Sequence, residues 1–271
     1  SRRRHTRYPL VTGVQTCALP ICSADLTAAN NVLAHVPDIN DFVRGFAELL
    51  NPSGVATFEF PHLYQLITER QFDTIYHEHF SYLSFTTVRE IFLTQGLSVF
   101  DVEEIGTHGG SLRVFAQRVD AGIHPISDRV GQILELESGA GMRSLSFYEG
   151  FERDAEIAKS KLLEILVEAK LSGNDVAAYG AAAKGNTFLN YAGVKSDLIS
   201  FVVDRNPAKQ GKWMPGSRIP IVGEDWLRRK RPAVIVILPW NIKSEVLHQL
   251  SYAKEWGARF VVAQPEVSFV G

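Results

Sequence analysis

The chain has 271 residues, of which 45% are hydrophobic and 21% charged, with a formal net charge of −2. This composition is typical of globular proteins, and the length allows two domains with separate cores. No apolar run reaches the ~18 residues that a membrane-spanning helix needs, and the near-balanced charge argues against a dedicated nucleic-acid-binding protein. We therefore expect neither membrane nor nucleic acid as a partner, and a cytoplasmic location by default.

Residues 1–22 differ from the rest of the chain because they hold four arginines, both cysteines and no acidic residue. A basic start before an apolar stretch can be a secretory signal or a basic arm, but Thr12, Gln15 and Thr16 interrupt the apolar stretch here. The segment resembles translated sequencing-adaptor sequence, so we expect it to lie outside the fold. The remaining residues contain no cysteine, which excludes structural disulfides and cysteine-based zinc sites among them.

The first half of the remaining chain alternates helix and strand signals. Asp38 can cap a helix, Asn51–Gly54 can end it, and Gly96 suits the end of a second helix. The short turn Gly106–Gly110 joins the last two strands, which permits antiparallel pairing alone. In chain order the expected elements are a helix over 38–50, a strand over 55–60, a helix over 86–95, and strands over 97–105 and 112–117.

The second half predicts one long amphipathic helix over 144–171, followed by a new alternation of strands and helices. Short, continuous apolar strands that alternate with helices indicate a parallel sheet covered on both faces. The expected strands span 176–179, 199–203, 234–238 and 259–263, and the expected helices span 186–191 and 243–255. The fold class is therefore α/β, with two units.

The run Asp73–His79 is the densest group of polar side chains. It lacks the spacing of a zinc-protease site, which needs two histidines four residues apart on a helix. If the run is extended, Tyr76 and Glu78 face one side and His77 and His79 the other. A solvated polar loop remains an alternative, but we favour an acid–base site, because histidine titrates near neutrality and a neighbouring carboxylate tunes it.

Three further groups follow predicted strands, where α/β folds place ligands. His35 lies just beyond the first strand, although it could equally be a core or helix-start residue. The turn Gly180–Gly185 precedes a helix, as phosphate-binding loops do, but it matches neither nucleotide-binding glycine pattern and could simply pack helix on strand. Asp204 stands at the spacing of a ribose-binding acid, and Trp240 with Asn241 falls on the same sheet edge.

Seven segments in order resemble S-adenosylmethionine-dependent C-methyltransferases that act on nucleotide-linked ketosugars, over residues 24–267. The segments are NNVLAHVPDINDFV, FEFPHL, FDTIYHEHFSYLS, THGGSLRVF, YGAAAKGNTFLN, VVDRNPAKQGKWMPGSRIPI and LPWN. The family has a zinc-binding N-terminal domain, a middle methyltransferase domain of Rossmann type, and a C-terminal Rossmann-like domain that helps hold the nucleotide sugar.

The resemblance implies an incomplete methyltransferase sheet followed by a second Rossmann-like parallel-sheet domain. Residues 23–118 would be the C-terminal part of the methyltransferase domain, 119–171 a helical connector, and 172–271 the nucleotide-sugar-binding domain. The zinc-binding domain and the glycine-rich loop for S-adenosylmethionine would be missing, so we expect an incomplete cofactor site, an inactive fragment and no metal site in this chain. An exposed strand edge near 24–30 would favour aggregation.

The resemblance also implies roles for single residues. His79 corresponds to the family's base, with Glu78 and Tyr76 beside it and His35 across the pocket. Tyr76 or His35 would donate a hydrogen bond to the enolate oxygen, and Glu78 would anchor a sugar hydroxyl or tune His79. Asn31 and Asn30 would lie near the cofactor. The residues expected to bind the nucleotide sugar are Lys184, Gly180, Asn186, Asp204, Trp240 and Asn241.

Two alternatives belong to other functional classes. The first is a non-catalytic nucleotide- or sugar-nucleotide-binding module formed by residues 172–271. The second is an NAD-linked sugar dehydrogenase, which would use Gly180 and Asp204 but would leave the run 76–79 without a role. Methyl transfer that depends on Tyr76 and His79 separates the proposed enzyme from the first alternative.

Overall fold

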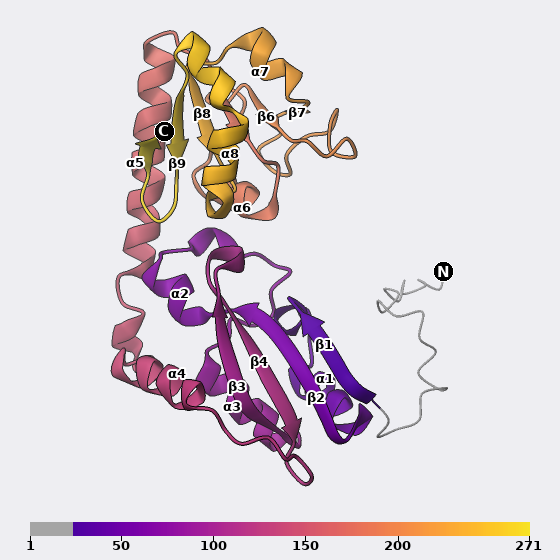
Figure 1. Ribbon diagram of the computed structural model, residues 1–271. Coiled ribbons are helices and arrows are strands. Elements are labelled where there is room, and N and C mark those ends of the chain that lie inside the picture. The colour runs from indigo at the N-terminus through magenta and orange to yellow at the C-terminus, as the bar shows by residue number, and fades with distance from the viewer. Residues whose placement is uncertain (1–23) are drawn as a thin grey trace, which may run out of the picture.

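The computed structural model describes residues 24–271, so the expectation for residues 1–22 lies outside the described part of the chain. Two sheets form two lobes stacked one on the other, and the long helix α5 (Phe151–Leu171) runs along the second lobe (Figure 1). Within residues 24–271 no helix is both long and apolar enough to cross a membrane.

The first lobe is built on a four-stranded sheet in the order β1-β2-β4-β3. β1 runs parallel to β2, whereas β4 is antiparallel to both of its neighbours. The β3–β4 pairing confirms the antiparallel pair expected from the short connection, and β1 lies at an edge of the sheet (Figure 1). The strands are β1 (Ala24–Asn30), β2 (Leu50–Pro61), β3 (Leu97–Ile105) and β4 (Ser111–Arg118).

One face of this sheet is apolar because alternate residues of its central strands point to the same side. The fully buried side chains on β2 and β4 include Ala56, Phe58, Phe60, Leu112, Val114 and Ala116. Three helices contribute to the core on this face: α1 (Ile39–Leu49), α3 (Phe85–Thr94) and α4 (Asp128–Gly139). A further short helix, α2 (Leu63–Thr68), follows β2.

The predicted helix ends are confirmed. The Asp38 carboxylate accepts a hydrogen bond from the backbone N–H of Asp41 at 2.9 Å, which caps α1. Gly96 has a φ of +87° two residues after α3, a conformation that glycine adopts without a steric penalty.

Glu137 ties α4 to the start of α3. Its buried carboxylate accepts hydrogen bonds from the backbone N–H groups of Phe85 (2.6 Å) and Thr86 (2.8 Å), from the Thr86 hydroxyl (2.6 Å) and from His62 Nε2 (2.7 Å). Burial alone would raise the pKa of Glu137, but these donors outweigh it and hold the pKa below its ordinary value. The ionised carboxylate therefore holds two helices and β2 together.

Replacing Glu137 by Gln should destabilise the protein at pH 7 by about 3 kcal/mol, because buried donors lose an ionised acceptor. A carboxylate whose pKa is lower in the folded state stabilises fully above the unfolded pKa, about 4.3 for Glu, and loses this contribution as the pH falls below it. Urea unfolding at pH 7 and pH 3.5 measures both effects. Glu135→Gln, at an exposed position on the same helix, should change neither value.

The second lobe contains a six-stranded sheet in the order β10-β9-β8-β5-β6-β7. All pairs are parallel except β9–β10. The strands are β5 (Val176–Tyr179), β6 (Phe201–Val203), β7 (Ile221–Val222), β8 (Val234–Ile237), β9 (Arg259–Val262) and β10 (Ser268–Val270). Each face of this sheet packs into its own apolar cluster. One cluster includes residues of α5 and α6 (Ala183–Tyr191). The other includes residues of α7 (Asp225–Lys230) and α8 (Lys243–Gln249). The predicted α/β class, with a parallel sheet covered on both faces, is confirmed.

The single helix predicted over residues 144–171 is wrong in its extent. The α-helix in this range is α5, which begins at Phe151, and residues 144–150 before it are not α-helical. Gly150, directly before α5, has a φ of +90°, which an uninterrupted right-handed helix does not allow. α4 joins the core of the first lobe and α5 that of the second, so both helices belong to lobe cores.

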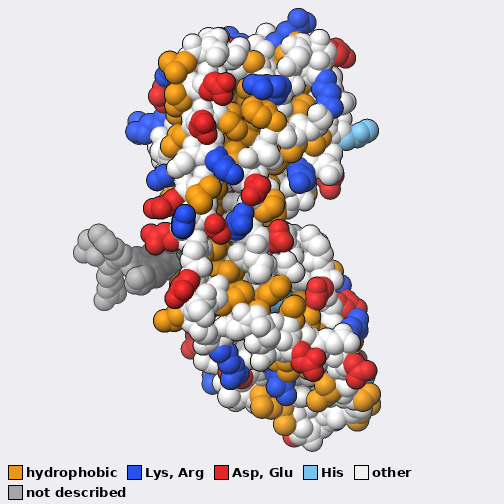
Figure 2. All heavy atoms as spheres, turned by 90° about the vertical axis from the view of Figure 1, so that its left-hand side faces the viewer, with side chains coloured by type: hydrophobic (Ala, Val, Ile, Leu, Met, Phe, Trp, Pro, Cys, Tyr) orange, Lys and Arg blue, Asp and Glu red, His pale blue; other side chains and the backbone are white. Residues whose placement is uncertain are grey.

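The segment 70–74 joins the two lobes. The Phe72 ring packs against Phe188 and Tyr191 on α6, with ring centroids 5.1 and 5.3 Å apart. Arg70 pairs with Asp154 on α5 at 3.1 Å. Figure 2 shows acidic and basic side chains gathered at the narrower waist between the lobes. Because exposed ion pairs contribute little stability, the buried Phe72 contributes more to this junction than Arg70.

A candidate acid–base site at the junction of the lobes

A tight turn over residues 75–80 brings His79 next to His35. The backbone N–H groups of Phe80 and Ser81 both donate to the carbonyl of Ala34, at 2.8 and 3.3 Å. Ala34 belongs to the short helical turn that follows β1, at the end of the parallel strands where α/β folds place ligands. Residues about 45 positions apart in the chain therefore meet at one place.

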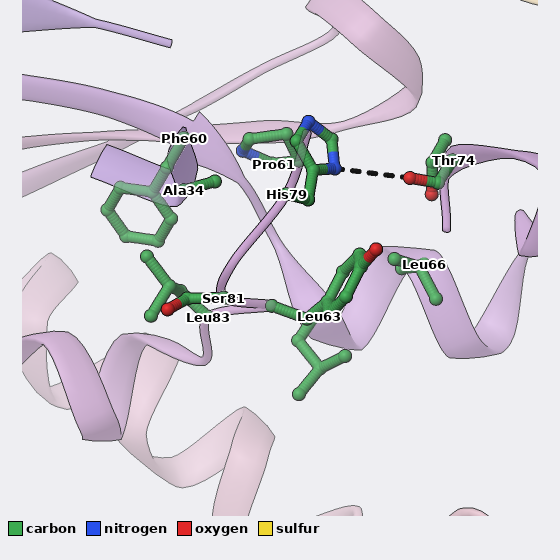
Figure 3. Close-up of a pocket in the computed structure, with 10 residues that line it drawn as sticks. Ala34, Phe60, Pro61, Leu63, Leu66, Thr74, His79, Ser81 and Leu83 are labelled. Carbon is green, nitrogen blue, oxygen red and sulfur yellow. Dashed lines mark hydrogen bonds between the residues drawn. The ribbon is translucent and has the colours of Figure 1, made fainter. Parts of the chain in front are cut away.

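His79 lies among aromatic side chains. Its ring centroid is 4.3 Å from that of Tyr76, 4.7 Å from that of His35 and 5.7 Å from that of Tyr82. His79 Nδ1 lies 3.1 Å from the carbonyl oxygen of Thr74, the contact that Figure 3 marks with a dashed line. A carbonyl only accepts, so Nδ1 carries the hydrogen and Nε2 is unprotonated in the neutral ring.

The predicted alternation of side chains over residues 76–79 is wrong, because this run forms a turn. The backbone N–H of His79 donates to the carbonyl of Tyr76 at 3.0 Å, which places these two side chains together. The side chains of His77 and Glu78 are exposed. Glu78 instead uses its backbone carbonyl, which accepts a hydrogen bond from His35 Nδ1 at 3.0 Å.

The surroundings favour proton transfer at neutral pH. Burial and the nearby His35 lower the pKa of His79, while the bond to Thr74 and the Glu78 carboxylate oppose them. Burial, with smaller effects of Glu78 and Tyr82, raises the pKa of Tyr76. At pH 7 the imidazole is therefore neutral and can accept a proton, and the phenol keeps its proton and can donate a hydrogen bond.

Two predicted residues of the second lobe reach this place. Trp240, which follows β8, donates its indole N–H to a carboxylate oxygen of Asp73 at 2.8 Å. Lys184 on α6 lies over the Trp240 ring, with Nζ 4.5 Å from its centroid. The charge of Lys184 also contributes to the lowered pKa of His79. Burial lowers the pKa of Lys184 itself, and the charge of Asp73 opposes this effect.

The turn before α6 packs tightly on the next loop. Gly180 has a φ of +94°, and a Cβ there would lie 2.6 Å from Pro239 Cδ, so no larger residue fits. A Cβ on Gly185 would lie 2.6 Å from Leu238 Cβ, so the helix packs closely on the end of β8 here. Such packing is the alternative explanation of this turn that the sequence analysis gave beside phosphate binding. Asn186 has a buried side-chain oxygen without a hydrogen-bond partner in residues 24–271, and Asn241 is exposed.

Asp204 organises the loop after β6. One of its carboxylate oxygens accepts from the backbone N–H of Ala181 at 2.8 Å and lies 3.3 Å from Lys209 Nζ. The other accepts from the backbone N–H of Asn206 at 2.8 Å. The carboxylate therefore joins the ends of β5 and β6, and a ribose would have to share an acceptor that already holds three donors.

Glu59, on β2, is the main hydrogen-bond acceptor at the end of β1, where Asn30 and Asn31 were expected to bind the cofactor. Asn31, with a φ of +55°, directs its side-chain amide to a carboxylate oxygen of Glu59 at 3.5 Å, and Asn30 is exposed. Thr107 and Arg113 also donate to the Glu59 carboxylate, both at 3.1 Å. The sequence analysis did not single out Glu59, although it is the only charged residue in the strand predicted over 55–60.

The described residues contain no group of three or more histidine, cysteine, aspartate or glutamate side chains that could hold a metal ion. His79 Nδ1 is engaged by Thr74 and the His77 side chain is exposed, so the two rings do not form a ligand pair. The zinc-binding domain that the resemblance implies concerns sequence outside this chain and stays a prediction.

Comparison with known proteins places the chain in a family. A model of the C-methyltransferase C-terminal domain matches residues 106–265. The chain belongs to the C-methyltransferase family. C-methyltransferase NovU of Streptomyces niveus is 36% identical over 243 residues, which is 90% of this chain and 58% of NovU. The chain thus spans little more than half of this relative's length, and the predicted family resemblance is confirmed.

Solved methyltransferase structures are only distantly similar to this C-methyltransferase. An S-adenosylmethionine-dependent methyltransferase from Mesorhizobium loti is 19% identical with a TM-score of 0.31, over 37% of this chain and 64% of that chain. The 1,6-didemethyltoxoflavin-N1-methyltransferase of Burkholderia thailandensis is 15% identical with a TM-score of 0.27, over 35% of this chain and 43% of that chain.

The titration of His79 tests the electrostatics of the site. We expect its midpoint, followed by NMR of the imidazole resonances, to lie below the ~6.5 of free histidine. Lys184→Gln should raise the midpoint, because it removes a positive charge that disfavours the imidazolium. Lys161→Gln, at an exposed position on α5, should leave it unchanged. An equal His79 midpoint in the wild type and in Lys184→Gln would contradict the electrostatic interaction between the two groups.

Proposed function

We propose that this C-methyltransferase chain carries the proton-transfer and nucleotide-sugar-binding parts of an S-adenosylmethionine-dependent enzyme that methylates a carbon of a nucleotide-linked ketosugar. The observation that carries the proposal is the neutral imidazole of His79, whose ring lies beside Tyr76 and His35 and whose pKa is lowered in part by the charge of Lys184. Family membership supports methyl transfer to carbon. A cytoplasmic location is part of the proposal.

The chemistry begins with a proton on the carbon next to the ketone. His79 Nε2 takes this proton as general base, and the electron pair of the C–H bond moves toward the ketone oxygen to form an enolate. A base alone is not sufficient, because the developing charge needs a hydrogen-bond donor, a contribution of about 3 kcal/mol in comparable sites. Tyr76 or His35 supplies that donor. The exposed Glu78 carboxylate binds a sugar hydroxyl or favours the imidazolium that forms.

Lys184 is the proposed partner of the diphosphate. Its ammonium group is held between Trp240 and Asp73 at the junction of the lobes, which places the cation near the proposed base. A lysine acts on phosphate as a point charge and does not need bidentate geometry. Around it, Gly180, Asn186, Asp204 and Asn241 complete the proposed nucleotide-sugar site at the carboxyl ends of the second sheet's parallel strands.

S-adenosylmethionine, when bound, would supply an electrophilic methyl group. Among the described residues, Asn30 and Asn31 at the end of β1 suit it through their amide groups, and Asn31 is already held by Glu59. We propose that the rest of this site lies outside the chain, as does the zinc-binding domain. His79, Tyr76 and Lys184 would still bind the nucleotide sugar and exchange its acidic proton.

Deuterium exchange isolates the proposed proton transfer from methyl transfer. The chain is incubated in D₂O with dTDP-4-keto-6-deoxyglucose, and NMR follows loss of the proton next to the ketone. His79→Asn should slow exchange about 100-fold, as expected for loss of a general base. Tyr76→Phe should slow it about 10-fold or more if Tyr76 is the oxyanion donor.

His248→Asn, at an exposed position on α8, is the matched control and should exchange at the wild-type rate. Exchange at full rate in His79→Asn would refute the assignment of the base. If the wild-type chain binds the nucleotide sugar but exchanges no proton above background, the alternative of a non-catalytic binding module becomes the better one.

Calorimetric titration with thymidine diphosphate tests the role of Lys184. Lys184→Gln should weaken binding about tenfold or more, because a charge-assisted hydrogen bond to phosphate is lost. Lys161→Gln changes the net charge by the same amount as Lys184→Gln, but at an exposed position on α5. It should bind thymidine diphosphate as tightly as the wild type does. Equal affinities in all three proteins would place the diphosphate elsewhere.

A further inference from the structure

Asp73 is a buried carboxylate that the proposed chemistry does not use. It is 1% exposed and lies in the segment that joins the two lobes. One carboxylate oxygen accepts the indole N–H of Trp240 at 2.8 Å, and the other has no partner within residues 24–271. A buried ionisable group destabilises a protein unless an opposite charge or hydrogen bonds compensate for it. We therefore expect Asp73 to have a function between the two halves of the site.

The residue after Asp73 fixes the proposed base. The Thr74 carbonyl accepts the hydrogen of His79 Nδ1 at 3.1 Å. The segment is rigid, because the hydroxyl and backbone N–H of Thr74 both bond the carbonyl of Gln71, at 2.8 and 3.1 Å. The position of the carbonyl that selects the His79 tautomer is therefore tied to the position of the Asp73 side chain.

The second lobe holds the other end of this connection. Trp240 reaches Asp73 past Gly109, where a Cβ would lie 2.5 Å from the indole, so the glycine leaves the room that the ring needs. Lys184 lies 4.5 Å above the same indole. Burial raises the pKa of Asp73 to about 6, against the effects of Trp240 and Lys184. At pH 7 the carboxylate is thus largely ionised between an indole N–H and a cation.

We propose that Asp73 is a positioning residue that links the diphosphate-binding side of the second lobe to the base in the first. Trp240 bonds the side chain of Asp73, the backbone joins Asp73 to Thr74, and the Thr74 carbonyl keeps the hydrogen of His79 on Nδ1. This inference rests on the proposed roles of His79 and Lys184. Free histidine favours the opposite tautomer, with the hydrogen on Nε2, so the loss of this connection leaves the imidazole bound in place but unable to act as base.

The tautomer of His79 is the direct readout. It is measured in the full chain, labelled with ¹⁵N-histidine at pH 8, from the nitrogen chemical shifts. The wild type should show the hydrogen on Nδ1. Asp73→Ala and Trp240→Phe should shift the population toward Nε2–H. Asp73→Asn keeps an oxygen that can accept the indole hydrogen, so it should retain the wild-type tautomer.

Trp256→Phe is the matched control for Trp240→Phe. It removes an indole hydrogen bond of similar length, 3.1 Å to the carbonyl of Pro232, inside the second lobe. This variant should keep the wild-type tautomer, because it weakens the second lobe without touching the connection. If Asp73→Ala does not fold, Trp240→Phe alone carries the test.

The deuterium-exchange assay adds a kinetic readout. Asp73→Ala and Trp240→Phe should lower the kcat of exchange at least tenfold, whereas Lys184→Gln should act mainly by raising KM. An unchanged His79 tautomer in both folded variants overturns the inference, as does a loss confined to KM. Exchange that depends on His79 but not on Asp73 overturns it too and leaves the proposed function standing. Conversely, a tautomer that follows Asp73 in a chain that exchanges no proton refutes the proposed function and leaves the positioning role of Asp73 in place.

Discussion

The packing of Phe72 into the second lobe is the contact on which the arrangement of the site depends. Its ring lies in the core formed by α5, α6 and the second sheet, although the residue belongs to the first half of the chain. The aromatic turn that contains His79 begins immediately after this anchor. The position of the candidate base relative to Lys184 and Trp240 is therefore set by apolar burial, and hydrogen bonds refine it.

Local patterns predicted the local elements well. The cap at Asp38, the end of α3 at Gly96 and the β3–β4 pair follow from short-range chemistry, and the structure places each where the sequence indicates. The helix predicted over 144–171 was wrong only at its start: α5 begins at Phe151, and Leu145, which the apolar pattern included, is exposed. Gly150 was the sequence signal for this later start, because it takes a left-handed backbone angle directly before the helix.

The candidate site shows the limit of residue-by-residue interpretation. The structure brings Tyr76 and His35 next to His79, but the expected alternation over residues 76–79 was wrong, because this turn is held by the distant carbonyl of Ala34. The backbone carbonyl of Glu78 accepts a hydrogen bond from His35, whereas the sequence analysis assigned a role only to the Glu78 carboxylate. Asp73 was visible in the sequence only as one more polar residue, since its significance comes from a partner 167 positions away.

That separation also determines when the site can form during synthesis. The Asp73–Trp240 bond and the contacts of Phe72 with α6 join segments far apart in the chain, so their closure has a high entropic cost and follows the folding of each lobe. Domains emerge and fold from the N-terminus onward. A nascent chain that has folded its first lobe thus holds His79 and Tyr76 without the tryptophan and lysine that complete their surroundings. The acid–base site is therefore completed only after the segment that contains Trp240 has been synthesised.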